Sequence, residues 1–147
     1  MTLNEIVALL PYTPPFLFVD ELEEVTENGA TGSYTFKPSE FFYEGHFKNS
    51  PITPGVILTE TMGQIGAVCL GIYLLREEIV VKGLPDIALT SYETTFFAPV
   101  FPGEKVTVTS QKEYFRFSKL KCKVEMRNSE GKLICSGTIA GFIKNRK

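Results

Sequence analysis

The sequence predicts an α+β fold in which a curved antiparallel sheet of about six strands wraps one long central helix. A mostly apolar stretch at residues 56–75 provides the helix. Two strand-like segments precede this stretch and four follow it, separated by short turns. Because the whole chain has about the length of one domain, we expect a single domain over residues 1–147.

The N-terminal part predicts a short helix followed by two strands. Thr2 and Glu5 form the T-x-x-E pattern of a capping box, and Pro11 ends the helix that this box opens. Residues 16–25 are strand-like, a Glu-Asn-Gly turn follows, and residues 30–36 return as a second strand.

A proline-containing loop at residues 38–54 leads into the apolar helix, which we expect to end near Arg76. Apolar residues cover every face of this helix, so it must be buried on all sides. Its length is near that of a membrane span. However, it contains Glu60 and Gln64, and an acid at the membrane midplane costs about 2.5–3.5 kcal/mol. The stretch is therefore interpreted as a core helix.

Four strands are expected after Pro85, at residues 87–97, 105–115, 119–127 and 132–143. Because short turns separate them, we expect an antiparallel meander. Such a sheet can bury the preceding helix by curling around it, which is the hot-dog arrangement. One edge of the sheet stays uncovered, and dimerisation through that edge would cover it.

Composition and charge argue against several classes of function. The formal net charge of −2 gives no general attraction to nucleic acid or to anionic membranes. A single histidine and three cysteines without C-x-x-C spacing argue against a metal site, so we expect free, buried thiols in a reducing compartment. The N-terminus lacks the basic and apolar blocks of a signal peptide, and we expect a cytoplasmic location.

Residues 111–123 hold five basic side chains and one acid, Glu113. This segment is either a solvated strand face or a docking patch for an acidic partner. The basic residues are Lys112, Arg116, Lys119, Lys121 and Lys123.

Two ionisable residues are candidates for catalysis. His46 lies among aromatic residues in the loop, and its imidazole suits a general base at neutral pH; a structural or exposed histidine is the alternative. Glu60 is the only carboxylate in the apolar helix, where Gln64 could orient it; a carboxylate that fixes packing is the alternative. The helix dipole keeps such a carboxyl ionised whereas burial protonates it, and the sequence leaves this balance open.

Gly55 leads directly into the helix, whose first backbone N–H groups are unpaired and carry the positive end of the dipole. The N–H groups of Gly55 and Val56 could therefore form an oxyanion hole, in which each donor is worth about 3–4 kcal/mol. With a thioester carbonyl held there, His46 could take the α-proton while a protonated Glu60 gives a proton to the departing 3-hydroxyl.

The central motif resembles the signature of the 3-hydroxyacyl-[acyl carrier protein] dehydratases of fatty acid synthesis. That signature is G-H-F-P-x-x-P-x-x-P-G followed by E-x-M-x-Q, and the similarity spans nearly the whole chain. The matching residues are Gly45, His46, Phe47, Pro51, Pro54, Gly55, Glu60, Met62 and Gln64.

This resemblance implies a cofactor-free hydro-lyase that converts a 3-hydroxyacyl thioester into the trans-2-enoyl thioester. It implies a hot-dog homodimer, or a trimer of dimers, in which His46 works with Glu60 of the partner chain. The oxyanion hole would lie at Gly55 and Val56. The substrate would arrive on acyl carrier protein, an acidic partner that the basic segment could bind, chiefly through Lys112, Arg116, Lys119 and Lys121.

The chain departs from the family pattern at positions that carry no catalytic group, namely Tyr12, Lys48, Thr53, Thr61 and Gly63. Thr61 and Gly63 replace alanines, which suggests an altered acyl tunnel and a specialised pathway such as polyene or other secondary lipid synthesis. Two other functions stay open. One is a hot-dog thioesterase, and the other is a non-catalytic subunit that binds acyl carrier protein.

Overall fold

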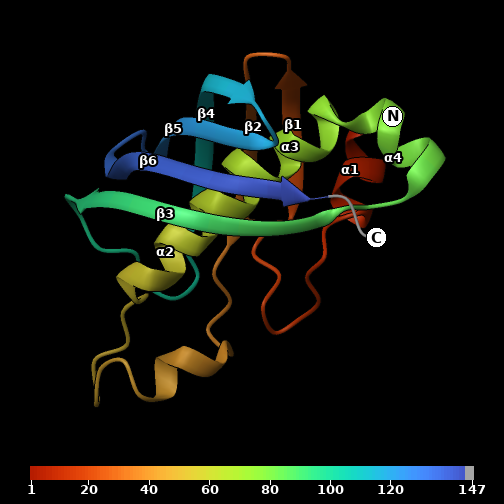
Figure 1. Ribbon diagram of the computed structural model, residues 1–147. Helices are drawn as coiled ribbons and strands as arrows, with labels where there is room; N and C mark the ends of the chain where they lie inside the picture. The colour runs from red at the N-terminus through yellow and green to blue at the C-terminus, as the bar shows by residue number, and fades with distance from the viewer. Residues whose placement is uncertain (145–147) are drawn as a thin grey trace.

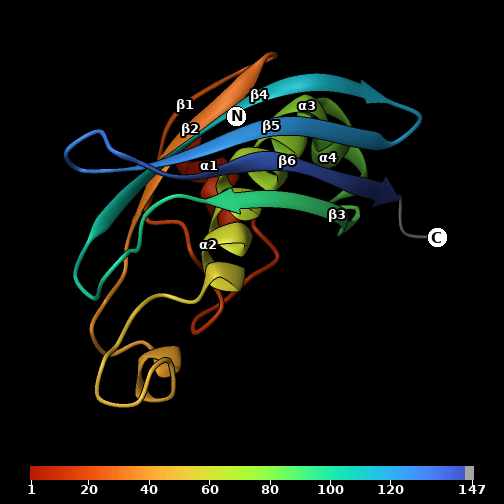
Figure 2. The same ribbon diagram turned by 90° about the vertical axis from the view of Figure 1, so that its left-hand side faces the viewer.

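The computed structural model describes residues 1–144 and contains one antiparallel sheet of six strands in the order β1-β2-β4-β5-β6-β3. The sheet curves around a run of helix on its concave side (Figures 1 and 2), which is the expected hot-dog arrangement. The strands are β1 (Glu21–Thr26), β2 (Gly29–Thr35), β3 (Asp86–Phe96), β4 (Lys105–Arg116), β5 (Lys119–Asn128) and β6 (Leu133–Lys144).

The long central helix is confirmed, and its middle is a π-helical turn that the sequence pattern did not predict. It consists of α2 (Gly55–Met62), η2 (Gly63–Val68) and α3 (Cys69–Leu74). The remaining helices are α1 (Leu3–Ala8), the 3-10 turn η1 (Phe41–Glu44) and α4 (Arg76–Lys82), the last also unpredicted. Within residues 1–144, only the run Gly55–Leu74 is long and apolar enough to cross a membrane, and 78% of its most apolar window is buried inside the fold.

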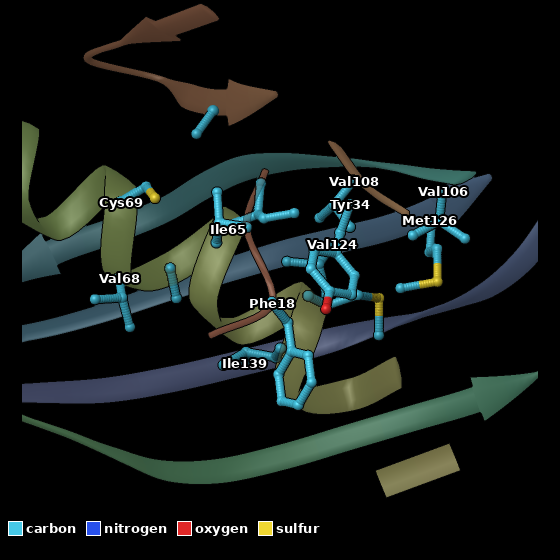
Figure 3. Close-up of a cluster of buried hydrophobic side chains, with 14 of the residues drawn as sticks. Phe18, Tyr34, Ile65, Val68, Cys69, Val106, Val108, Val124, Met126 and Ile139 are labelled. Atoms are coloured by element: carbon cyan, nitrogen blue, oxygen red, sulfur yellow. The ribbon is translucent and has the colours of Figure 1, made fainter. Parts of the chain in front are cut away.

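The core lies between the central helix and the concave side of the sheet (Figure 3). Alternate residues of β4 and β5 point inward and are buried, as the two-residue period of a strand requires. They meet the fully buried Ile65 and the nearly fully buried Val68 of η2. Three free cysteines are buried as expected, and burial raises the pKa of each thiol to about 12, which keeps the thiols protonated at neutral pH.

The capping box of α1 is confirmed, because Thr2 Oγ1 accepts from the Glu5 N–H (3.1 Å) and Glu5 Oε2 accepts from the Thr2 N–H (2.8 Å). The first strand was predicted to begin at residue 16, but β1 begins only at Glu21. The backbone groups of Phe16 and Phe18 instead bond to the side chain of Gln64.

The predicted meander is wrong for β3, which follows the central helix in the chain. β3 pairs with β6 at the far edge of the sheet, whereas β4 pairs with β2. The connection at residues 97–104 is long enough to cross between these places, unlike the tight turns that join β4 to β5 and β5 to β6. In its observed place β3 presents Ile87 and Leu89 to the central helix.

Two features of the fold matter for function, a projecting segment and a free sheet edge. The segment between β2 and α2, which contains η1, projects away from the sheet and the central helix in both views (Figures 1 and 2). In addition, β3 is a long edge strand that pairs with a neighbour on one side only among the described residues. Tyr92 and Phe96 in the second half of this strand, and Phe97 directly after it, are exposed, and Tyr92 and Phe96 lie near the N-terminus of α2.

Candidate active site

A groove of about 730 Å³ runs between the first turns of α2 and the inner face of β3. It contains three of the residues predicted from the sequence, Gly55, Val56 and Glu60. The full lining is Phe16, Gly55, Val56, Ile57, Thr59, Glu60, Tyr92, Thr94 and Phe96. The groove is therefore apolar over most of its length, with one carboxyl group and one helix N-terminus opening into it.

Gln64 fixes the position of the Glu60 carboxyl. Its Nε2 donates to Glu60 Oε1 (3.1 Å) and to the carbonyl of Phe16 (3.0 Å), and its Oε1 accepts from the N–H of Phe18 (2.8 Å). Because Gln64 is fully buried and both ends of its amide are engaged, the amide cannot turn without breaking these bonds. The predicted supporting role of Gln64 thus has a definite geometry.

Burial raises the pKa of the Glu60 carboxyl, and hydrogen bonds from Gln64 and Tyr92 oppose that rise without cancelling it. The pKa therefore lies above its ordinary value. This is the direction that a proton donor needs.

The N-terminus of α2 leaves two donors free at the groove. Pro54 is the N-cap residue, and its carbonyl accepts from the N–H groups of Ile57 (2.9 Å) and Leu58 (3.1 Å). Within residues 1–144, the N–H groups of Gly55 and Val56 have no acceptor. They carry the positive end of the helix dipole and can bind a carbonyl oxygen that gains negative charge.

At Gly55 the distinctive feature is a close approach by a side chain rather than an unusual backbone angle. A Cβ at this position would lie 2.9 Å from Cζ of Phe96, which is closer than such atoms pack. The ring of Phe96 therefore lies directly over the start of the helix, beside the two free donors.

His46 lies in the projecting segment, directly after η1. Its Nδ1 is 2.9 Å from the carbonyl oxygen of Ile52, and the Ile52 N–H donates to the His46 carbonyl (2.9 Å). A carbonyl only accepts, so Nδ1 carries the proton and Nε2 of the neutral ring is left as the base. The His46 ring also stacks on Phe47, with 3.9 Å between ring centroids.

The described part of one chain does not bring His46 into the groove that contains Glu60. Of the predicted site residues, Glu60, Gln64, Gly55 and Val56 are gathered at one place, and His46 stands apart on its own segment. In residues 1–144 no three His, Cys, Asp or Glu side chains cluster closely enough to hold a metal ion.

The predicted docking residues lie on β4 and β5, near the turn that joins the two strands. Lys121 pairs in register with Tyr114, and Lys119 with Arg116, whereas Lys112 pairs with the buried Cys122. Lys112 therefore lies on the helix-facing side of the sheet and does not share a face with the others.

Two of the lysines on the outer face have an acidic partner. The Nζ atoms of Lys121 and Lys123 lie 3.7 and 4.0 Å from the carboxylate of Glu113, which reduces the free positive charge of the patch. Phe117 at the turn is 91% exposed, beside Arg116 and Lys119. The outer face thus combines cations with one exposed ring.

Sequence reasoning missed two tyrosines at the groove. Tyr92 on β3 is within hydrogen-bonding reach of Glu60, and Tyr12 lies close enough to interact electrostatically with Glu60 and Tyr92. In the sequence, Tyr12 stands out only as a departure from the family pattern. Tyr92 gave no signal, because its proximity to Glu60 depends on which edge of the sheet β3 occupies.

The departures at Thr61 and Gly63 do not open the groove. Thr61 is fully buried and donates to the carbonyl of Ile57 (2.8 Å), and neither residue lines the groove. A Cβ at Gly63 would lie 2.7 Å from Cδ1 of Leu89, so the space of the missing methyl is already filled. Within one chain, these two positions therefore do not alter the lining of the groove, and the altered acyl tunnel stays a prediction.

Comparisons with solved structures identify the fold. A chain of the dehydratase heterocomplex ApeI:P from Xenorhabdus doucetiae superposes with a TM-score of 0.79 over 96% of this chain and 91% of that chain, at 13% identity. The thioesterase HI1161 from Haemophilus influenzae superposes with a TM-score of 0.71 over 99% and 92%, at 16% identity. At such identities these likenesses establish the hot-dog fold alone.

Sequence comparisons establish the family. The chain is 34% identical over 143 residues to the 3-hydroxyacyl-[acyl-carrier-protein] dehydratase FabZ of Clostridium perfringens strain SM101, covering 95% of this chain and 96% of that protein. It is 32% identical over 143 residues to FabZ of Caldicellulosiruptor bescii, covering 97% and 98%. The family model of the FabA-like domain matches residues 10–140. The chain, whose groove brings the Glu60 carboxyl and the N-terminus of α2 together, therefore belongs to the FabA-like family.

Proposed function

We propose that this protein is a 3-hydroxyacyl-[acyl carrier protein] dehydratase of fatty acid synthesis. The observation that carries the proposal is the groove, where a carboxyl group with a raised pKa lies beside two free helix N–H groups. Relatives that share about a third of the sequence over nearly the full chain bear that name.

The reaction follows from the placement of these groups. The thioester oxygen binds the N–H groups of Gly55 and Val56, which stabilise the negative charge that develops when the α-proton leaves. Nε2 of His46 takes that proton, and the C2–H electron pair forms the C2=C3 double bond. Glu60 gives its proton to the 3-hydroxyl as the C3–O bond breaks, and one water molecule leaves.

The site needs a second copy of the chain, and we propose a homodimer, whether alone or within a trimer of dimers. His46 lies on the segment between η1 and α2 and does not line the groove of its own chain. The free edge of β3, with the exposed rings of Phe96 at its end and Phe97 directly after it, provides the surface through which two copies can pair. His46 of the partner subunit then faces Glu60.

The carrier-bound substrate is recognised on the outer face. Acyl carrier protein is acidic, and Arg116, Lys119 and Lys121 offer it cations beside the exposed ring of Phe117. Lys112 is not part of this face. We place the protein in the cytoplasm as a single domain.

The test is a mass-spectrometric assay on short 3-hydroxyacyl and 2-enoyl thioesters with the wild type, His46→Ala and Glu60→Ala. We expect reversible loss and gain of one water in the wild type and in neither variant. Mixing the two inactive variants, with exchange of subunits, should restore part of the activity, because a mixed dimer has one site with both groups intact.

Release of free thiol without loss of water would show a thioesterase, which a helix carboxyl and helix N–H groups also suit. Neither reaction, combined with binding of acyl carrier protein, would show a non-catalytic subunit. Restored activity is the outcome that a site contained within one chain cannot give.

A further inference from the structure

Two tyrosines meet at Glu60 from elements that are distant in the sequence. Tyr92 comes from β3, lines the groove and is within hydrogen-bonding reach of the Glu60 carboxyl. Tyr12 comes from the segment after α1 and interacts electrostatically with Glu60 and Tyr92 without a hydrogen bond to the carboxyl.

The donors around Glu60 come from opposite walls of the groove. Gln64 donates from the helix to Oε1 (3.1 Å), and the rest of its amide is committed to Phe16 and Phe18. Tyr92 lines the facing strand of the same groove, with its phenol within hydrogen-bonding reach of the carboxyl. When Glu60 gives up its proton, the new carboxylate is therefore met by two donors that are already in place.

We propose that Tyr92 is a positioning residue which, together with Gln64, holds the Glu60 carboxyl in the groove and stabilises the carboxylate formed as Glu60 donates its proton. The inference rests on the proposed function, because it assigns the facing wall of the same site. It separates the roles of the two tyrosines, since only Tyr92 lines the groove within hydrogen-bonding reach of the carboxyl.

The phenol suits this role because it keeps its own proton. Burial, with the nearby Glu60, raises the pKa of Tyr92, so its O–H remains a donor throughout the neutral range. A donor to the carboxylate favours the ionised form of Glu60 and lowers its pKa. Removing the hydroxyl therefore moves the pKa of Glu60 upward.

The experiment compares Tyr92→Phe with Tyr12→Phe in the full-length protein. Tyr12→Phe is the matched control, because it removes a neighbouring phenol that does not donate to Glu60. Glutamate labelled with ¹³C at the carboxyl carbon allows Glu60 to be titrated by NMR, and Glu60→Gln identifies its signal. We expect the pKa of Glu60 to rise in Tyr92→Phe and to rise less, or not at all, in Tyr12→Phe.

Kinetics provide the second readout. We expect Tyr92→Phe to lower kcat about tenfold with little change in KM, as for loss of one hydrogen bond to a charged group, and to move the basic limb of the pH profile upward. An unchanged Glu60 titration, or equal shifts in both variants, overturns the proposal. The NMR titration does not depend on turnover, so an inactive wild type would refute the proposed function and leave this inference to be judged separately.

Discussion

Replacing Gln64 with leucine tests whether its amide joins the N-terminal segment to the central helix. Leucine has nearly the same volume, so the change removes hydrogen bonds and creates little cavity. The N–H of Phe18 loses its acceptor at 2.8 Å, and Phe18 is fully buried, so water cannot replace the bond. The carbonyl of Phe16 also loses its donor, but Phe16 is 42% exposed and water can reach it.

A buried unsatisfied donor costs about 1–3 kcal/mol, and we allow about 1 kcal/mol more for the partly exposed carbonyl. Gln64→Leu is therefore expected to lower the free energy of unfolding by about 2–4 kcal/mol. Urea denaturation at a fixed protein concentration measures it, because oligomerisation makes apparent stability depend on concentration.

The matched control is Gln111→Leu on the exposed surface of β4, which should change the stability by less than about 0.5 kcal/mol. If Gln64→Leu changed the stability as little as this control, the hydrogen bonds from Gln64 to Phe16 and Phe18 would not contribute to stability as the distances indicate.

Three further predictions follow from the same contacts. Gly55→Ala places a Cβ 2.9 Å from Cζ of Phe96, so the Phe96 ring, which lies beside the two free N–H groups, must shift. We expect kcat/KM in the water-exchange assay to fall at least tenfold, and unchanged kinetics would contradict this. Gly63→Ala meets Cδ1 of Leu89 at 2.7 Å and should cost about 1–3 kcal/mol in urea denaturation, recovered in part by adding Leu89→Ala. Because the pKa of Glu60 is raised on folding, its folded form binds the proton more tightly, and stability is lost as the pH rises above the unfolded value of 4.5. Glu60→Gln should therefore be more stable than the wild type at neutral pH but not at pH values well below 4.5, and equal stability at both would refute the shift.

Local patterns predicted the elements of this fold well, and long-range pairing set the limit. The capping box at Thr2 and Glu5, the apolar helix and four later strands all depend on spacing within a short window. The place of β3 depends on pairing with β6, which no local pattern encodes. Similarly, residues 16–20 have strand-like composition, but their backbone bonds to Gln64 instead.

The same distinction applies to the site. Glu60 and Gln64 stand one helical turn apart, so their contact could be predicted from the sequence. Gly55 and Val56 follow from the start of the helix. Tyr92 reaches Glu60 only because β3 lies at the sheet edge nearest α2, and the direction of the Glu60 pKa depends on burial.

The position of β3 also sets the order in which the site can be built. α2 and β3 are close in the sequence and form the two walls of the groove, but in the described chain β3 is held in the sheet only by β6, the last strand. Contacts between distant parts of a chain form late, because loop closure must come first. During synthesis Glu60 therefore emerges well before β6, and the groove is completed only when β6 has emerged and paired with β3. A chain that stops before β6 would keep the acid but lose the enclosure that raises its pKa.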